Sequence, residues 1–138
     1  MTDVPKPLVA DTHTIVWYLQ NDPQLSAKAG EMLDAAVADG DPIFVSAATV
    51  VELNYLLSKG KISEADYRWY LLVMETAGEV VEVAPVDMGV ARAVEMVPRD
   101  EVPDPIDRMI AATSVALGVP LVTRDRRLRS LETVETVW

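Results

Sequence analysis

The chain has no cysteine and only one histidine, His13, among its 138 residues. Without cysteine there is no disulfide bond, no thiol nucleophile and no thiolate-ligated zinc site. One histidine is too few for a ribonuclease mechanism that uses two histidines as acid and base, and too few for a multi-histidine metal centre. Any catalysis by this chain must therefore rely on oxygen-bearing side chains.

Several nucleotide-binding and hydrolase motifs are also missing. No two of the six glycines are separated by a single residue, which excludes a GxGxxG loop, and there is neither a Walker A loop nor a GxSxG elbow. No apolar run approaches the ~20 residues that cross a bilayer, and the first residues do not resemble a signal peptide. We therefore expect no membrane association and a cytoplasmic location.

The composition is that of a globular protein, with 50% hydrophobic and 25% charged residues. A chain of this length is too short for two ordinary domains, so residues 1–138 are expected to form one domain. The net charge of −10 predicts weak nonspecific affinity for nucleic acid and suggests a basic partner. A local exception is the arginine-rich segment at 124–129.

Short apolar segments alternate with helical ones along the chain. Strands are expected at 7–10, 42–46, 80–84, 120–123 and 133–137, and helices at 14–20, 26–38, 47–59, 63–76, 87–96 and 105–117. This alternation predicts an α/β fold with a central, mostly parallel sheet of four to five strands and helices on both faces. Ligands of such sheets bind beyond the carboxyl ends of the strands, where Asp11 and Asp125 are expected.

Two acids interrupt apolar segments in the first half of the chain. Asp11 directly follows an expected strand, so it fits either a functional loop or the N-cap of the next helix. Glu52 shares a helix face with Tyr55 and Leu56. It is either a site residue or a partly exposed side chain whose stem covers the edge of the core.

The segment 102–128 has carboxylates at both ends of an apolar helix and strand. Asp104 reads as an N-cap with Pro105 at the first helical position, and capping alone explains Asp107 as well. However, small side chains follow Asp107 on its helix face, which favours a functional role for Asp107. Asp104 is then either a helix cap or a residue that supports the site without binding a metal directly. Asp125 is a site residue, a cap or a member of a local salt bridge.

The acids have one explanation in common. Several carboxylates gathered in one pocket repel each other, and a hard divalent cation such as Mg²⁺ or Mn²⁺ offsets this cost. A site of this kind suits phosphodiester hydrolysis by an activated water. We therefore expect four acids from distant segments to converge, namely Asp11, Glu52, Asp107 and Asp125.

Three fragments, in this order and at these intervals, carry a resemblance to a known family. They are LVADTHTIVWYL at 8–19, VSAATVVEL at 45–53 and DPIDRMIAATSVALGVPLVTRD at 104–125. The chain resembles the PIN domain, and within it the VapC-type toxin ribonucleases of type II toxin–antitoxin systems. The resemblance covers nearly the whole length.

The resemblance implies a magnesium-dependent endoribonuclease, with manganese as an alternative, that acts as a toxin. It implies that the catalytic residues and metal ligands are drawn from Asp11, Glu52, Asp107 and Asp125, with Asp104 as a cap or supporting residue. Ser46 and Thr12 match polar positions that could bind metal-bound water.

The resemblance also implies partners. These are an RNA substrate, a second copy of the chain, and a cognate antitoxin with a basic or DNA-binding region that blocks the acidic site. Trp17, Trp69 and Tyr70 are candidates for apolar contact surface. The expectation for His13, Trp17 and Tyr18 themselves is packing or local hydrogen bonding.

Two other functions are compatible with the residues. One is a catalytically silent binding module with the same fold, in which caps and salt bridges explain the acids. The other is a DNA-directed nuclease, because no base-reading motif separates RNA from DNA.

Overall fold

The computed structural model describes residues 7–76 and 80–138. Segment 1–6, part of the N-terminal stretch examined for a signal peptide, lies outside them. The described residues form one five-stranded sheet in the order β3-β2-β1-β4-β5, in which all paired strands are parallel. The strands are β1 (Leu8–Ala10), β2 (Ile43–Ser46), β3 (Val81–Ala84), β4 (Leu121–Val122) and β5 (Thr136–Val137). The predicted α/β class and parallel sheet are confirmed.

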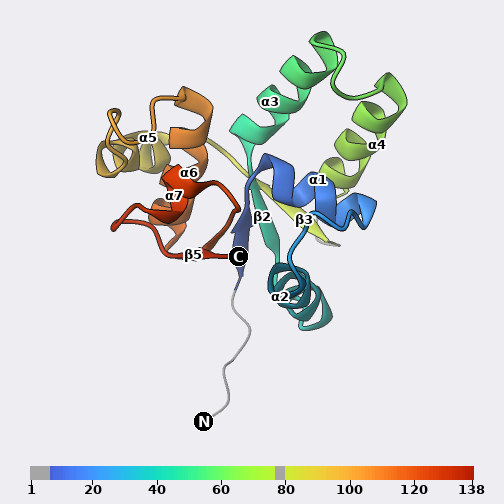
Figure 1. Cartoon of the computed structure of the whole chain (residues 1–138), viewed down its shortest axis with the longest axis horizontal. Coiled ribbons are helices and arrows are strands. Elements are labelled where there is room, and N and C mark those ends of the chain that lie inside the picture. The colour runs from blue at the N-terminus through green and yellow to red at the C-terminus, as the bar shows by residue number, and fades with distance from the viewer. Residues whose placement is uncertain (1–6, 77–79) are drawn as a thin grey trace.

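Helices cover both faces of this sheet (Figure 1). They are α1 (Thr12–Gln20), α2 (Ala27–Ala38), α3 (Ala47–Ser58), α4 (Glu64–Glu75), α5 (Met88–Ala93), the 3-10 turn η1 (Val94–Met96), α6 (Pro105–Leu117) and α7 (Arg126–Arg129). Among the described residues, none of these helices is both long enough and apolar enough to span a membrane.

Alternation along the strands divides the core into two layers. Leu8 and Ala10 pack in one apolar cluster, whereas Val9 between them packs in the other. Successive side chains of a strand point to opposite faces, and here both faces are covered, which is why the strands read as continuous apolar runs.

The carboxyl ends of β1 and β4 lie side by side because these strands pair directly. Ala10 stands opposite Val122, and the backbone N–H of Asp11 donates to the carbonyl of Val122 at 3.3 Å. Residues 11 and 123–125, more than a hundred positions apart in the sequence, therefore emerge at the same edge of the sheet. The fold positions the site through this pairing.

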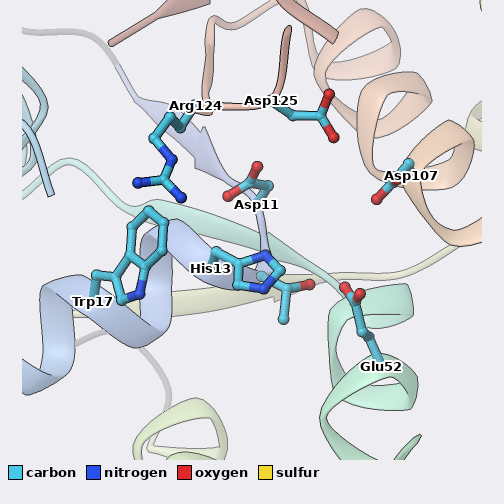
Figure 2. A pocket seen from close by; sticks show the side chains of 8 residues that line it. Asp11, His13, Trp17, Glu52, Asp107, Arg124 and Asp125 are labelled. Atoms are coloured by element: carbon cyan, nitrogen blue, oxygen red, sulfur yellow. The ribbon is translucent and has the colours of Figure 1, made fainter. Parts of the chain in front are cut away.

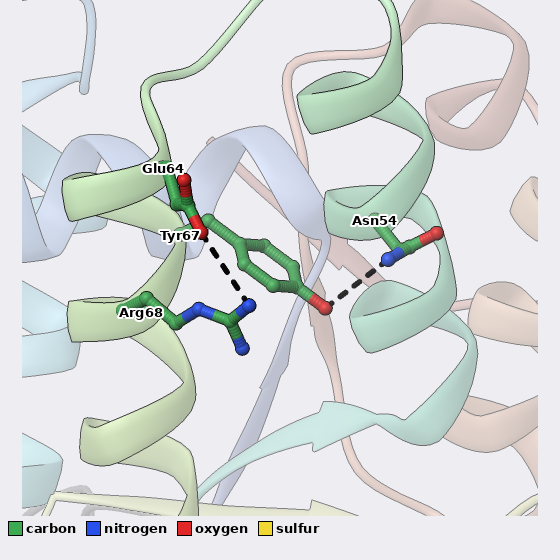
Figure 3. A network of polar contacts seen from close by, with 4 residues as sticks. All are labelled: Asn54, Glu64, Tyr67 and Arg68. Atoms are coloured by element: carbon green, nitrogen blue, oxygen red, sulfur yellow. Dashed lines mark hydrogen bonds and ion pairs between the residues drawn. The ribbon is translucent and has the colours of Figure 1, made fainter.

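Helices α3 and α4 form a hairpin beside the site (Figure 3). The Asn54 side-chain amide of α3 donates to the hydroxyl of Tyr67 on α4 at 3.3 Å. Arg68 and Glu64 form an exposed i,i+4 ion pair at 3.6 Å, a type of contact that adds little stability. Ser63 caps α4 as predicted, by accepting from the backbone N–H of Asp66 at 3.0 Å.

Tyr70 is a wrong candidate for contact surface, whereas the packing expected for Trp17 is confirmed. Trp17 and Tyr70 are only 8% and 2% exposed, because both side chains are packed in the folded chain instead of lying on an open face. Trp69, at 42% exposed, is the only one of the three proposed contact aromatics that remains available. Tyr18 makes the expected local hydrogen bond, which its hydroxyl donates to Asp34 at 2.8 Å.

Candidate active site

Asp11 is both a helix cap and a pocket residue. It directly follows β1, and its Oδ1 accepts a hydrogen bond from the backbone N–H of Thr14 at 2.9 Å. This cap places the start of α1 at Thr12, two residues earlier than predicted. Its Oδ2 accepts from the hydroxyl of Thr123 at 2.5 Å. The carboxylate is only 8% exposed and is held by one contact on each oxygen, so its orientation is determined by the fold.

Asp125 is placed by the end of β4 and by a short helix. Its backbone N–H donates to the hydroxyl of Thr123 at 3.0 Å, and its Oδ1 accepts from the N–H of Arg127 at 2.8 Å, which caps α7. Of the readings open from the sequence, the cap is confirmed. Among the described residues Asp125 takes part in no salt bridge.

Glu52 and Asp107 come from two helices that pack against each other, α3 and α6. Both side chains are partly buried and both point into the space that Asp11 and Asp125 border (Figure 2). Tyr55, expected on the apolar face beside Glu52, is 52% exposed. Leu56, on the same face, packs against the core, so Glu52 lies where the core meets the pocket.

Asp104 lies outside this pocket. Its Oδ1 accepts from the backbone N–H groups of Ile106 and Asp107 at 2.8 and 3.1 Å, with Pro105 in the first turn, so the predicted N-cap of α6 is confirmed. The side chain is exposed. Asp104 still affects the site, because its negative charge is one cause of the raised pKa of Asp107.

The four predicted acids meet around one pocket of about 250 Å³. Its lining is made of Asp11, Thr12, His13, Trp17, Glu52, Asp107, Arg124 and Asp125. The pocket lies beyond the carboxyl ends of β1 and β4, where ligands of open parallel sheets bind. The expected convergence of four acids from four segments is therefore found, while their catalytic role stays a prediction.

Burial and the neighbouring carboxylates both affect the pKa of Asp107. Burial, and then repulsion from Asp104, Glu52, Asp125 and Asp11, raise the pKa of its carboxyl to about 7. The group is thus poised between its protonated and ionised forms near neutral pH. A cation in the pocket would remove the repulsion and favour the ionised form.

The donor set fits a hard divalent cation. The side chains around the pocket offer carboxylate oxygens from Asp11, Glu52, Asp107 and Asp125 and no sulfur. Within the described ranges, no three Asp, Glu or His side chains lie close enough together to enclose an ion by themselves. A cation here would keep several waters, as Mg²⁺ commonly does in proteins.

The two hydroxyl residues suggested for binding water differ in position. Thr12 lines the pocket and its hydroxyl donates to that of Thr49 at 3.1 Å. Ser46 is fully buried, does not line the pocket and caps α3 by accepting from the N–H of Ala48 at 3.0 Å. Of the two hydroxyl residues, only Thr12 lines the pocket, and the binding of water by either residue stays a prediction.

The structure adds Thr123 and Arg124 to the site. The Thr123 hydroxyl joins Asp11 to the backbone of Asp125, and Arg124 lines the pocket with its guanidinium carbon 4.6 Å from the centroid of the Trp17 ring. Both residues directly precede Asp125 in the TRD segment. Their position beside an expected site acid was the signal available in the sequence, although nothing there revealed the contact with Trp17.

The chain is similar to known proteins in both sequence and structure. A profile of the PIN domain family matches residues 8–133. The chain is 31% identical over 123 residues to a Mycobacterium tuberculosis protein named Ribonuclease VapC22, covering 89% of this chain and 90% of that protein.

Solved structures share the fold at lower identity. VapBC2 from Rickettsia felis, solved bound to a promoter DNA fragment, matches with a TM-score of 0.70 and 17% identity over 94% of this chain and 97% of that chain. DNA-bound VapBC from Salmonella typhimurium gives a TM-score of 0.67 and 22% identity over 96% and 97%. FitAcB from Neisseria gonorrhoeae gives 0.63 and 21% over 95% and 96%.

Proposed function

Because this chain belongs to the PIN domain family, we propose that it is a metal-dependent endoribonuclease that acts as the toxin of a type II toxin–antitoxin pair. The similarity to a protein named as a VapC ribonuclease supports RNA as the substrate and hydrolysis as the reaction. We propose that residues 1–138 form one domain, because both apolar clusters of the described residues pack on the same sheet.

The observation that carries the proposal is the ring of four carboxylates around one pocket (Figure 2). Asp11, Glu52, Asp107 and Asp125 would hold a divalent cation, Mg²⁺ or alternatively Mn²⁺. When bound, the cation supplies Lewis acidity that favours attack of water on phosphorus and offsets the charge of the phosphate. No covalent intermediate with the protein is required, which agrees with the absence of cysteine from the chain.

The residues of the chain prepare the site in distinct ways. Thr14 and Thr123 orient the Asp11 carboxylate through hydrogen bonds to its two oxygens. Asp107 has its pKa raised to about 7, so it exchanges a proton near neutral pH and loses it when positive charge enters the pocket. Asp104 and Asp125 secure helix starts at the border of the pocket.

The proposed partners follow from the same charge distribution. A cognate antitoxin with a basic or DNA-binding region would fit an acidic pocket on a chain of net charge −10. Complexes named VapBC and FitAcB are among the solved structures that share this fold.

We propose that the chain also forms a homodimer, with the exposed Trp69 as one apolar contact residue. We further propose that it acts in the cytoplasm, where its RNA substrate is found.

The test is cleavage of total RNA by purified, antitoxin-free protein with and without Mg²⁺. We expect cleavage only with the metal, and loss of cleavage in Asp107→Asn, while the matched control Asp100→Asn retains it. Asp100 is an exposed acid that does not line the pocket. Full activity in Asp107→Asn would contradict the assignment, as would cleavage of DNA in preference to RNA.

A protein that cleaves no nucleic acid but still binds an antitoxin would favour the rival function, a catalytically silent binding module. The meeting of Asp11, Glu52, Asp107 and Asp125 around one pocket argues against that alternative, because helix caps alone do not require four carboxylates from distant segments to share one cavity.

A further inference from the structure

One residue in the lining of the acidic pocket carries a full positive charge. Arg124 lies between Thr123, which bonds Asp11, and Asp125, so the end of β4 delivers an arginine and two site residues to the same place. Its side chain is exposed. Figure 2 shows the guanidinium above the ring of Trp17, at the opposite side of the pocket from Asp107 and Glu52.

Arg124 does not neutralise the acids around it. Among the described residues no carboxylate lies within 4.0 Å of its guanidinium, and no hydrogen bond from that group occurs. Its placement comes instead from Trp17, with the guanidinium carbon 4.6 Å from the ring centroid. Contact with an aromatic face fixes the position of the charge and leaves its N–H donors free for another acceptor.

The aromatic platform under Arg124 is itself held in place. Trp17 is 8% exposed, and its ring lies 5.7 Å from that of His13 and 6.0 Å from that of Trp138, centroid to centroid. Trp17 belongs to α1, the helix that Asp11 caps. The aromatic ring under Arg124 and the carboxylate of Asp11 therefore belong to the same helix and its cap, which places the arginine beside the acids.

A phosphodiester that enters this pocket carries a negative charge toward four carboxylates. A cation among the acids would offset part of the repulsion, and a second positive group in the pocket lining would bind a phosphate oxygen directly. Arginine suits this role, because its planar fork of donors matches phosphate geometry.

We propose that Arg124, held on the ring of Trp17, binds a phosphate of the RNA strand at the acidic pocket and thereby positions the scissile bond. This inference rests on the proposed ribonuclease function and assigns to that function a phosphate-binding residue outside the carboxylate set. The chain has a net charge of −10, and Arg124 is the arginine in the lining of the pocket. Its replacement should therefore lower the affinity for RNA.

The experiment compares Arg124→Gln and Arg124→Lys with the matched control Arg127→Gln. Arg127 is an exposed arginine of the same segment that does not line the pocket. Binding of a fluorescent single-stranded RNA of mixed sequence is measured across a salt series in the Asp107→Asn background with Mg²⁺. Cleavage of the same RNA is measured with Asp107 intact.

We expect Arg124→Gln to weaken RNA binding by about tenfold and to reduce the slope of log K against log salt by about 0.7, the effect of one lost phosphate contact on a single strand. Arg124→Lys should restore the slope but only part of the affinity, because lysine lacks the planar fork. Arg127→Gln should keep the affinity within about twofold and change the slope less than Arg124→Gln does.

Two results would overturn the inference and are distinguishable from failure of the function. If the wild-type chain cleaves RNA and Arg124→Gln matches Arg127→Gln in affinity, slope and cleavage rate, Arg124 does not bind the phosphate. If Arg124→Gln cleaves RNA normally and loses only antitoxin binding, Arg124 contacts the antitoxin and does not bind the RNA phosphate. If the wild-type chain neither binds nor cleaves RNA with Mg²⁺, the proposed function itself fails, and this inference with it.

Discussion

Thr123 donates a hydrogen bond of 2.5 Å from its hydroxyl to Oδ2 of Asp11, although the two residues are 112 positions apart. Thr123 is fully buried and Asp11 nearly so. The same hydroxyl accepts from the backbone N–H of Asp125 at 3.0 Å. Thr123 directly follows β4, and its hydroxyl links the side chain of Asp11 to the backbone of Asp125, two acids that line the pocket.

Replacing Thr123 by valine, which has the same shape but no hydroxyl, should lower the free energy of unfolding by about 1–3 kcal/mol, because it leaves buried polar groups without a partner. RNA cleavage should fall as well, since Asp11 loses a contact that orients it. Chemical denaturation and cleavage rates measure the two effects. Thr123→Ser, which keeps the hydroxyl, should recover most of both, and equal losses in the serine and valine variants would contradict the role of the hydrogen bond.

The stability of the metal-free chain should depend on pH through Asp107. Its pKa is about 7 in the folded chain, against an ordinary value of 3.8, so between these values the folded state binds more protons than the unfolded one. Stability from this group is therefore present at low pH and lost as pH rises through about 7. Other groups add their own pH dependence, so the wild-type chain is compared with Asp107→Asn. This variant should lack the decrease in stability that the Asp107 carboxyl causes as pH rises.

Thermal unfolding in EDTA at pH 5, 6, 7 and 8 tests this prediction. Asp107→Asn should be more stable than the wild-type chain at pH 8, because the substitution removes a repelled charge from the pocket. A variant that parallels the wild-type curve over the whole range would show that the pKa of Asp107 is not raised in the folded chain.

Divalent cations should stabilise the folded chain. The unfolded chain has no preformed site, so a metal at 100 times its dissociation constant adds about 2.7 kcal/mol to the free energy of unfolding. Calorimetry with Mg²⁺ and with Mn²⁺ at pH 8 should show a rise in Tm that Asp107→Asn reduces. Asp100→Asn serves as the control that should respond like the wild-type chain, and an absence of any rise at millimolar metal would argue that the acids are structural.

Asp104 should affect stability more than catalysis. Asp104→Ala removes both hydrogen bonds to the start of α6 and should cost about 0.5–2 kcal/mol. Asp104→Asn keeps an oxygen for the cap and should be closer to the wild-type chain in stability. RNA cleavage under conditions where both variants are folded should persist, whereas loss of cleavage in the asparagine variant would make Asp104 a member of the site.

Some features of the fold could be read directly from local sequence. Ser26, Ser63 and Asp104 cap the helices predicted to follow them, because capping depends on a side chain reaching a backbone N–H only two or three residues away. The strands were found because apolar runs between turn residues are typical of sheets that are covered on both faces. Their ends shifted by one to three residues, although Val80, Pro120 and Thr123 just outside the observed strands still make backbone hydrogen bonds to neighbouring strands.

Other features depended on contacts between distant segments. Tyr70 was a candidate for apolar contact surface and is buried, because no local pattern says whether an aromatic residue faces a neighbouring helix or solvent. Ser46 was expected near the site, and its role as a cap buried at the start of α3 follows only from where β2 ends. Arg124 was visible as part of a basic segment, while its contact with Trp17 required the packing of α1 beside β4.

The sequence by itself determined the α/β alternation, the helix caps and the identity of the four acids, because each follows from periodicity or from chemistry within a few residues of the chain. Only the tertiary structure decided that these acids border one pocket, that Asp104 stands outside it, and that Thr123 joins two of them. The reason is the parallel pairing of β1 with β4, which brings residues 11 and 123–125 together. Side-chain distances across such a pairing are set by packing on both faces of the sheet, and no single segment contains that information.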